Sequence, residues 1–237
     1  VVAQDITRYG LDLYGRRTLA QLLPKLCAIE GIQWVRLHYL YPDEITDELI
    51  DVIAREPKIV KYLDIPIQHI SDRVLRAMHR RGTGQEIRTL FRKLRERIPG
   101  LVLRTSLIAG FPGETEEEFE ASYAFVDRVD FYETHIFKYS KREGTKAAVM
   151  DGQIDEKIKG ERSARMIALG ERKKKAYEDS FIGKEVEVLF EERAQIEGKA
   201  VMTGHTKEYM KIALETEKNI SNCIVKVRIE NHSQIIR

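Results

Sequence analysis

The feature that most constrains the fold is an alternation of strand-like and helix-like segments along residues 1–180. Strand-like runs are short and apolar or alternating, at residues 1–3, 34–40, 62–67, 101–109 and 131–137. Helical apolar spacing occupies the segments between and after them, at residues 17–29, 45–54, 71–79, 85–98, 115 onward and 154–180. Strands separated by helices predict βαβ units and a parallel sheet, an α/β fold. Five such strands favour a partial, TIM-like (β/α) barrel over an open sheet.

The pattern changes after Ile182-Gly183. Alternating segments follow at residues 184–190, 199–202, 208–214 and 224–229, with turns at Glu197-Gly198 and Gly204 between them. Short strands joined by such turns predict a small antiparallel β-barrel. We therefore expect two domains, a barrel domain at residues 1–181 and a β domain at residues 182–237.

Composition narrows the class of protein. A hydrophobic content of 43% and a net charge of +2 are typical of a globular chain and do not by themselves indicate nucleic-acid binding. No apolar run approaches ~18 residues, so we expect no membrane span. Cys27 and Cys223 are too far apart for a local metal motif, and we expect reduced thiols, no metal ligands, a cytoplasmic location and a monomer. The chain opens inside a strand-like run without Met, so we expect sequence to be missing upstream.

Polar and small residues follow the strands, where parallel barrels carry their reactive groups. Asp5 follows the first strand, and its carboxylate can bind an ammonium or hydroxyl group or simply cap a loop. Gln68 and His69 follow the third and can hydrogen-bond a sugar or carboxylate or cap the strand. The fourth carries Arg104 and leads into the turn 108–115, where glycines let backbone amides approach a ligand at a helix N-terminus. Phe137, at the end of the fifth, lies beside three cations and can stack on an adenine.

Several motifs, in order, resemble the radical methylthiotransferases that use S-adenosylmethionine. They are Ala3-Gln4-Asp5, Tyr9-Gly10, Asp12-Leu13-Tyr14-Gly15, Tyr41-Pro42-Asp43-Glu44, Leu63-Asp64-Ile65-Pro66-Ile67-Gln68-His69 and Gly110-Phe111-Pro112-Gly113-Glu114-Thr115. The resemblance implies a partial radical-SAM barrel with a [4Fe-4S] cluster and S-adenosylmethionine, a second cluster in an N-terminal domain, an electron donor, and a C-terminal TRAM domain at residues 182–229. It also implies that the cluster and one electron cleave S-adenosylmethionine to a 5′-deoxyadenosyl radical, which is the cofactor's own chemistry.

The resemblance also implies roles for particular residues. Asp5 would hold the methionine part of the cofactor, and Gln68 with Arg104 its carboxylate or ribose, where His69 is also expected. Ile108 and Gly110 would line the adenosine, with Phe137 near the adenine. The family's Cys-x₃-Cys-x₂-Cys cluster motif is absent from this sequence, so the chain alone is expected to be inactive, and no catalytic residue is assigned.

The resemblance leaves the substrate divided between two subfamilies. Up to about residue 125 the chain resembles enzymes that methylthiolate an aspartate of a small-subunit ribosomal protein. From Phe131 to Ser140, and again at 204–209, it resembles enzymes that act on threonylcarbamoyladenosine next to the tRNA anticodon. Residues 177–237 hold 9 Lys and Arg against 11 Asp and Glu, which is no obvious RNA-binding surface. The prediction leans to tRNA because the C-terminal domain faces the substrate, with the ribosomal protein as the alternative.

Two other classes of function compete with this one. A non-catalytic RNA- or protein-binding chain would keep the barrel and TRAM without the cluster. A hydrolase or aldolase barrel would need a lysine or a paired acid and base at the strand ends, and the set Asp5, Gln68, His69 and Arg104 offers neither.

Overall fold

The computed structural model describes residues 3–236 and consists of two compact units, Val1–Lys173 and Lys174–Arg237. The two units divide within a long helix, α7 (Glu156–Asp179). The functional domain boundary expected at residue 181 stays a prediction. No helix among the described residues has the length and apolar character that crossing a membrane requires.

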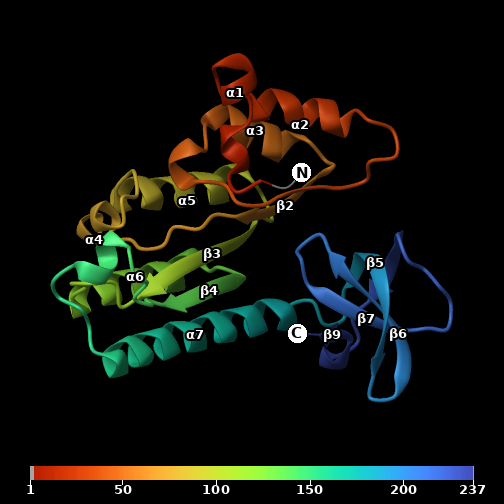
Figure 1. Cartoon of the computed structure of the whole chain (residues 1–237). Helices are drawn as coiled ribbons and strands as arrows, with labels where there is room; N and C mark the ends of the chain where they lie inside the picture. Colours follow the sequence, from red (N-terminus) through yellow and green to blue (C-terminus); the bar gives the residue numbers. More distant parts are fainter. Residues whose placement is uncertain (1–2, 237) are drawn as a thin grey trace. The chain divides into compact units, whose positions relative to one another are not determined.

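The first unit is built on a parallel four-stranded sheet in the order β1-β2-β3-β4 (Figure 1). Its strands are β1 (Val35–Leu37), β2 (Ile59–Asp64), β3 (Val102–Ala109) and β4 (Glu133–Lys138). The α-helices that precede, connect and follow the strands are α1 (Leu11–Tyr14), α2 (Leu19–Cys27), α3 (Asp47–Arg55), α4 (Asp72–Ala77), α5 (Gly84–Arg97), α6 (Glu116–Val129) and α7. Short 3-10 helices lie at η1 (Ile6–Arg8), η2 (Pro42–Glu44) and η3 (Lys146–Val149).

This order confirms the α/β class and the parallel sheet expected from the sequence. Four of the five predicted strands are present, each within a few residues of its expected bounds. The strand expected at residues 1–3 lies largely outside the described residues, and Ala3 itself is in no strand.

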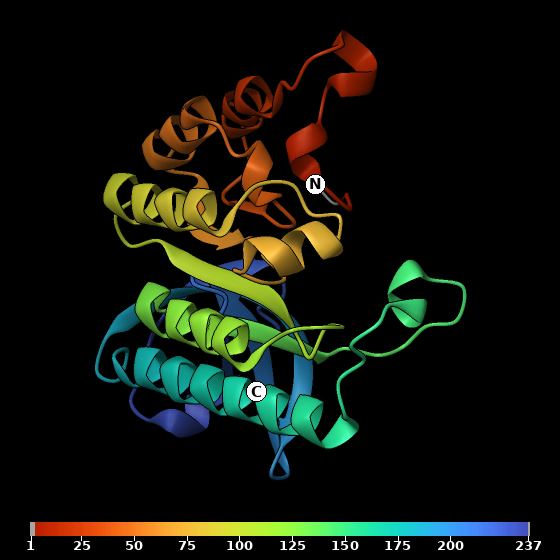
Figure 2. The ribbon, with the colours of Figure 1, turned by 90° about the vertical axis from the view of Figure 1, so that its left-hand side faces the viewer.

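The two faces of the sheet differ in what covers them. Along β3 the side chains alternate, and Leu103, Thr105 and Leu107 are buried on the helix-covered face. The core there includes an aromatic cluster in which Phe91 of α5 contacts Phe125 of α6 and Phe131, with ring centroids 5.7 and 5.3 Å away. Figure 2 shows α5, α6 and the start of α7 side by side over this face. The opposite, inner face carries the partly exposed members of the alternation.

Local signals fix where the helices begin. The side chains of Thr46 and Ser71 accept hydrogen bonds from the backbone N–H groups of Leu49 and Val74. Thr115 forms a reciprocal capping box with Glu118 at the start of α6. Caps of this kind satisfy N–H groups that have no partner inside the helix, so they place the loop-to-helix junctions that follow the strands.

The second unit is a five-stranded antiparallel sheet in the order β8-β5-β6-β7-β9. Its strands are β5 (Glu185–Ile196), β6 (Lys199–Thr206), β7 (Lys211–Glu215), β8 (Cys223–Arg228) and β9 (Ile235–Ile236), with η4 (His232–Gln234) before the last. Four of these strands were expected. β7 begins later than predicted because Tyr209 has a φ of 73°, a left-handed conformation that breaks the strand.

Candidate functional site

The carboxyl ends of β1 to β4 lie at one edge of the parallel sheet, and the loops that follow the strands gather there. These loops are residues 38–41, 65–71, 110–115 and 139–145. The inner face of the sheet and this edge together hold almost all the residues that the sequence singles out. Both belong to the first unit.

A charged network lies on the inner face and is centred on Arg104. Its guanidinium pairs with a carboxylate oxygen of Asp64 and contacts His135, with 2.9 Å between Nη2 and Nε2. A third contact joins Arg104 Nε to Glu133 Oε2 at 3.4 Å. The strand register places Arg104 opposite both Asp64 and Glu133, so the sheet itself brings these side chains together. Arg104 is thus held by acids of the chain's own strands.

Burial makes Asp64 unusual within this network. Its side chain is 1% exposed, and burial raises its pKa while Arg104 opposes the shift. One oxygen, Oδ1, has no hydrogen-bond partner among the described residues, although unpaired buried polar atoms are costly. The neighbouring His38 has its pKa lowered by burial and by Arg36, which favours a neutral ring. The inner face therefore holds a buried carboxylate oxygen whose hydrogen-bonding capacity no described residue uses.

Three further candidates lie along the same strands. Ile108 and Phe137 are register partners on the inner face of β3 and β4, and Phe137 is 54% exposed. Gln68 extends the pairing of β2 with β3, because its N–H donates to Ser106 and its C=O accepts from Ile108, both at 2.9 Å. Gln68 does this with a φ of 67°, a strained conformation for a residue other than glycine. Strain of this kind is found most often at functional sites.

The turn after β3 is held by a buried network. Glu114, 1% exposed in its side chain, accepts from His69 at 3.0 Å, from the N–H of Gly110 at 2.9 Å and from Arg162 of α7 at 2.7 Å. His69 Nδ1 accepts the N–H of Ser71 at 3.0 Å, so the proton lies on Nε2 and points to Glu114. Both ring nitrogens of His69 are thus used within the chain. The structure places this candidate ligand behind the turn, and its predicted cofactor contact stays a prediction.

Gly110 is required by packing at this turn. Its φ is 79°, and a Cβ added there would lie 2.2 Å from Cγ of Lys159. Only glycine combines this conformation with so close an approach. The backbone of the turn is therefore fixed from behind by Glu114 and α7.

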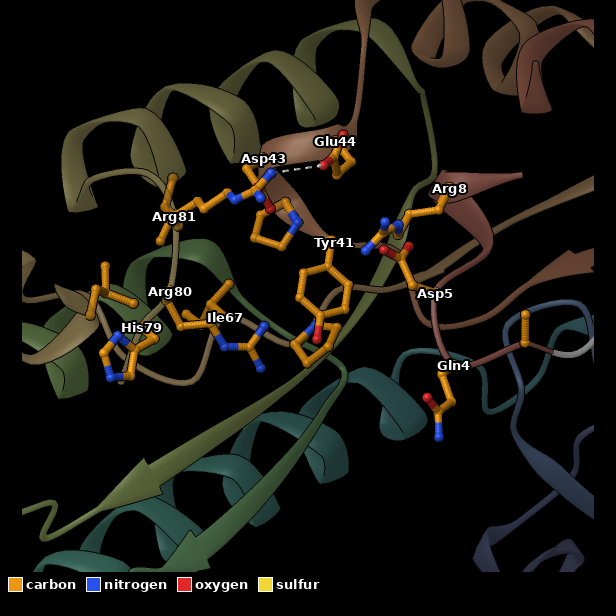
Figure 3. Close-up of a pocket in the computed structure, with 15 residues that line it drawn as sticks. Gln4, Asp5, Arg8, Tyr41, Asp43, Glu44, Ile67, His79, Arg80 and Arg81 are labelled. Carbon is orange, nitrogen blue, oxygen red and sulfur yellow. Dashed lines mark ion pairs between the residues drawn. The ribbon is translucent and has the colours of Figure 1, made fainter. Parts of the chain in front are cut away.

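Asp5 lies at the edge of the sheet, beside a cavity of about 510 Å³ (Figure 3). Its carboxylate accepts the N–H of Thr7 at 3.0 Å and so caps η1, the structural role that the sequence left open. The structure thus brings Arg104, Ile108 and Phe137 onto one face. It places Gln68 at their edge, Asp5 at the mouth and Gly110 in the turn after β3, with His69 in the loop after β2 and bonded to that turn through Glu114.

The chain's own residues do not fit an iron–sulfur cluster. Cys27 is buried and Cys223 is exposed, and they belong to different units. No group of three or more His, Cys, Asp or Glu side chains suited to a metal ion exists within residues 3–236. Cluster thiolates would have to come from outside this sequence.

Sequence reasoning missed the cavity and two of the residues that shape it. Tyr41, which the sequence analysis named only as part of a family motif, lines the cavity together with Arg80, whose guanidinium lies 4.8 Å from the centre of the Tyr41 ring. The two residues are far apart in sequence, so no local pattern joins them. The only signal was the pair Arg80-Arg81 before Gly82, at the end of a predicted helix.

Comparison with known proteins finds sequence relatives of this chain. The pattern of the Radical SAM superfamily matches residues 9–126. A ribosomal protein uS12 methylthiotransferase RimO from Anaeromyxobacter sp. is 49% identical over 195 residues, which are 82% of this chain and 42% of that protein. The protein of the same name from Alkaliphilus oremlandii is 43% identical over 239 residues, 97% of this chain and 54% of that protein.

The chain therefore spans about half the length of the curated relatives it matches. Among solved structures, the radical SAM enzyme coproporphyrinogen III oxidase (HemN) from Escherichia coli aligns with a TM-score of 0.52 at 15% identity. The alignment covers 80% of this chain and 50% of HemN, and at this low identity it shows a likeness of fold alone. The sequence relatives and the superfamily match point to the same family, and the parallel sheet is consistent with it. The chain belongs to the radical S-adenosylmethionine methylthiotransferase family.

Proposed function

We propose that this chain serves in a radical S-adenosylmethionine methylthiotransferase whose substrate is an aspartate of ribosomal protein uS12. The observation that carries the proposal is the 43–49% identity to proteins named for that reaction, over 82–97% of the chain. The sequence alone leaned to tRNA. The relatives' names favour the ribosomal protein, which was the alternative.

The inner face of the first unit is suited to S-adenosylmethionine. When bound, this cofactor supplies the methyl group and the fragment that removes a hydrogen atom from the substrate. Asp64 offers a buried unpaired oxygen for a hydroxyl or ammonium group, and Phe137 offers an exposed ring for the adenine. We propose that the turn at Gly110, held by Glu114, lies next to the adenosine. Arg104 would contact the cofactor while it keeps its ion pairs with Asp64 and Glu133.

The [4Fe-4S] cluster and the electron donor of the family are proposed to reach this chain from elsewhere. Since the described residues hold no cluster ligands, the 237-residue chain alone should bind S-adenosylmethionine weakly and transfer nothing. We place residues 182–237 as a TRAM-like domain that contacts the substrate, after a barrel domain at residues 1–181. The protein is proposed to act as a cytoplasmic monomer.

Substrate choice is tested with a reconstituted protein that contains this chain and a three-cysteine motif. Ribosomal protein uS12 and tRNA are offered separately with S-adenosylmethionine and a reductant, and products are read by mass spectrometry. We expect a methylthio group on an aspartate of uS12 and none on tRNA. Modified tRNA with unmodified uS12 would overturn the substrate, and modification of neither would overturn the function.

Cofactor placement is tested without catalysis. In the 237-residue chain, Phe137→Ala should weaken S-adenosylmethionine binding roughly tenfold, the size expected for loss of one aromatic–base stack. Val149→Ala is the control, because Val149 is 85% exposed in the same unit and belongs to η3, outside the strands of the sheet. Equal affinities of the two variants, measured by calorimetry, would remove Phe137 from the site.

A further inference from the structure

The cavity at the mouth of the sheet has no ligand assigned to it beyond the predicted contact of Asp5 with the cofactor. It encloses about 510 Å³ and is formed by loops that follow the strands and by the segment after α4. Its lining includes Asp5, Arg8, Tyr41, Pro66, Arg80 and Arg81. Figure 3 shows Tyr41 near its centre, with Arg80 and Arg81 reaching in from one side and Asp5 from the other.

The two neighbouring arginines of this cavity have different surroundings. Arg81 pairs with Glu44 at 3.8 Å, and Glu44 also pairs with Arg17. Arg80 has no ion-pair partner among residues 3–236, and its guanidinium stacks over Tyr41 at 4.8 Å. Stacking holds the plane of a guanidinium while leaving its N–H edge free for an anion.

The backbone after α4 fixes the position of Arg80. The helix ends in a Schellman motif, in which the N–H of Arg80 donates to the C=O of Leu75 at 2.8 Å and that of His79 donates to Arg76 at 3.0 Å. His79 takes the left-handed position of the motif with a φ of 55°, where glycine is usual. The chain therefore accepts some strain at His79, and Arg80 leaves the helix end held by a defined hydrogen bond.

We propose that Arg80 binds the side-chain carboxylate of the substrate aspartate. The inference rests on the proposed function, since it names a residue that recognises that substrate. A guanidinium offers two parallel N–H donors that match the two oxygens of a carboxylate. The only CH₂ of an aspartate side chain is bonded to its carboxylate carbon, so holding the carboxylate positions the carbon that is modified. Arg80 is thereby a specificity-determining residue for aspartate over asparagine.

The same chemistry has a second possible source, because S-adenosylmethionine also carries a carboxylate. Arg80 lies beyond the inner face, on the segment after α4, and shares its cavity with Tyr41 and Pro66 at the strand ends. Substrates reach parallel barrels from this edge. The substrate is therefore the source to which the proposal commits, and the experiment separates the two.

Binding of a uS12 peptide to the 237-residue chain tests the assignment, and it requires no cluster. The peptide spans the target aspartate, and a second peptide carries asparagine there. Wild type should prefer the aspartate peptide roughly 10- to 100-fold, the range expected for a hydrogen-bonded charge pair. Arg80→Gln should abolish this preference, and Arg80→Lys should retain part of it, because charge remains while the two-pronged geometry is lost.

Arg76→Gln is the matched control, since it removes the same charge from an exposed position on α4 outside the cavity. It should keep the full preference, and circular dichroism should show all variants folded. S-adenosylmethionine binding is measured on the same variants and should not change.

Three outcomes overturn the proposal. A preference for aspartate that survives in Arg80→Gln contradicts it while leaving the proposed function intact. A loss of S-adenosylmethionine affinity without a change in peptide preference assigns Arg80 to the cofactor instead. Wild type that binds neither peptide refutes the proposed substrate, and the role of Arg80 falls with it.

Discussion

The turn after β3 and the cavity around Arg80 lie at the same edge of the sheet but are built in opposite ways. Around the turn, the Glu114 carboxylate, the Arg162 guanidinium and the His69 ring all have partners inside the chain. In the cavity, Arg80 has an aromatic ring beneath it and, among residues 3–236, no ion-pair partner. The charged groups around the turn are satisfied without a ligand, whereas the guanidinium of Arg80 has room for an anionic partner.

Burial explains the difference. A charge that is almost fully buried must be paired and hydrogen-bonded, because desolvation would otherwise cost several kcal/mol, on the order of the whole stability of a domain. Glu114 and Arg162 are in that position, with side chains 1% and 8% exposed. Arg80 is only partly buried, so water can satisfy it until an anion arrives. A rigid turn and an open receptor can thus share one edge.

The largest expected effect comes from a substitution that disrupts the turn after β3. Glu114→Ala would leave Arg162 buried without its partner and remove the acceptor of the Gly110 N–H, and we expect a loss of about 3–5 kcal/mol in unfolding free energy. Trp34 is the only tryptophan and lies in the first unit, so its fluorescence during urea unfolding reports on this unit alone. Glu117→Ala, an exposed change nearby in the first turn of α6, is the control. Equal midpoints for both variants would show that the network does not stabilise the turn.

A second prediction separates backbone strain from close packing in that turn. Gly110 and Gly100 have φ values of 79° and 72°, but only Gly110 has a neighbour in the way of a Cβ. Gly100→Ala should cost about 1 kcal/mol for the left-handed conformation alone. Gly110→Ala should cost about 2–4 kcal/mol, because the contact with Lys159 adds an overpacking cost. The comparison fails if urea unfolding gives the same loss for both.

The same contrast explains what the sequence could predict. Signals that act over a few residues can be read from the sequence, so the strand-helix alternation is confirmed, and α3 and α6 begin close to the expected residues 45 and 115. The Gly-Phe-Pro-Gly turn was recognised, but its reason was not. Glu114 and Arg162 are 48 residues apart, and neither residue type indicates the other.

The candidate site residues differ in the same way, because some are placed by local strand alternation and others by tertiary packing. Strand alternation placed Arg104 and Phe137 on a shared face, which any parallel sheet would do. His69 looked like a ligand because a polar side chain followed a strand, and only tertiary packing shows that both its nitrogens are used. The relation of Arg80 to Tyr41 depends on how the segment after α4 folds back on the sheet edge, which no local rule contains.

The pH dependence of stability gives a smaller test, at the start of α6. Burial alone would raise the pKa of Glu118, but hydrogen bonds from Arg73, Thr115 and Ser71 outweigh it and lower the pKa to about 2. A carboxyl whose folded pKa lies below its ordinary value of 4.5 stabilises the fold above that pH, and the contribution is lost as pH falls toward 2. We expect about 1–2 kcal/mol, after allowing for the exposure of Arg73.

Glu118→Gln should remove this share of the acid sensitivity, so urea midpoints at pH 7 and pH 3 should differ less in the variant than in wild type. Glu120→Gln is a suitable comparison, because Glu120 lies on the same helix with an exposed pair to Arg165. An unchanged pH dependence in Glu118→Gln would mean that other carboxyls carry the acid response.

The smallest expected effect concerns Arg80 and completes the comparison. Arg80→Ala removes only a stacking contact on Tyr41, so the unfolding free energy should fall by about 0.5–1 kcal/mol. Arg162→Ala, in contrast, leaves the Glu114 carboxylate buried without its guanidinium, and should cost about 3–5 kcal/mol. Both are followed by Trp34 fluorescence in urea. A residue that contributes little to stability, yet is held by a Schellman motif with a strained His79, has a position that folding alone does not require. If Arg80→Ala proves as destabilising as Arg162→Ala, the Arg80 guanidinium stabilises the fold, and the argument that the cavity is a binding site fails.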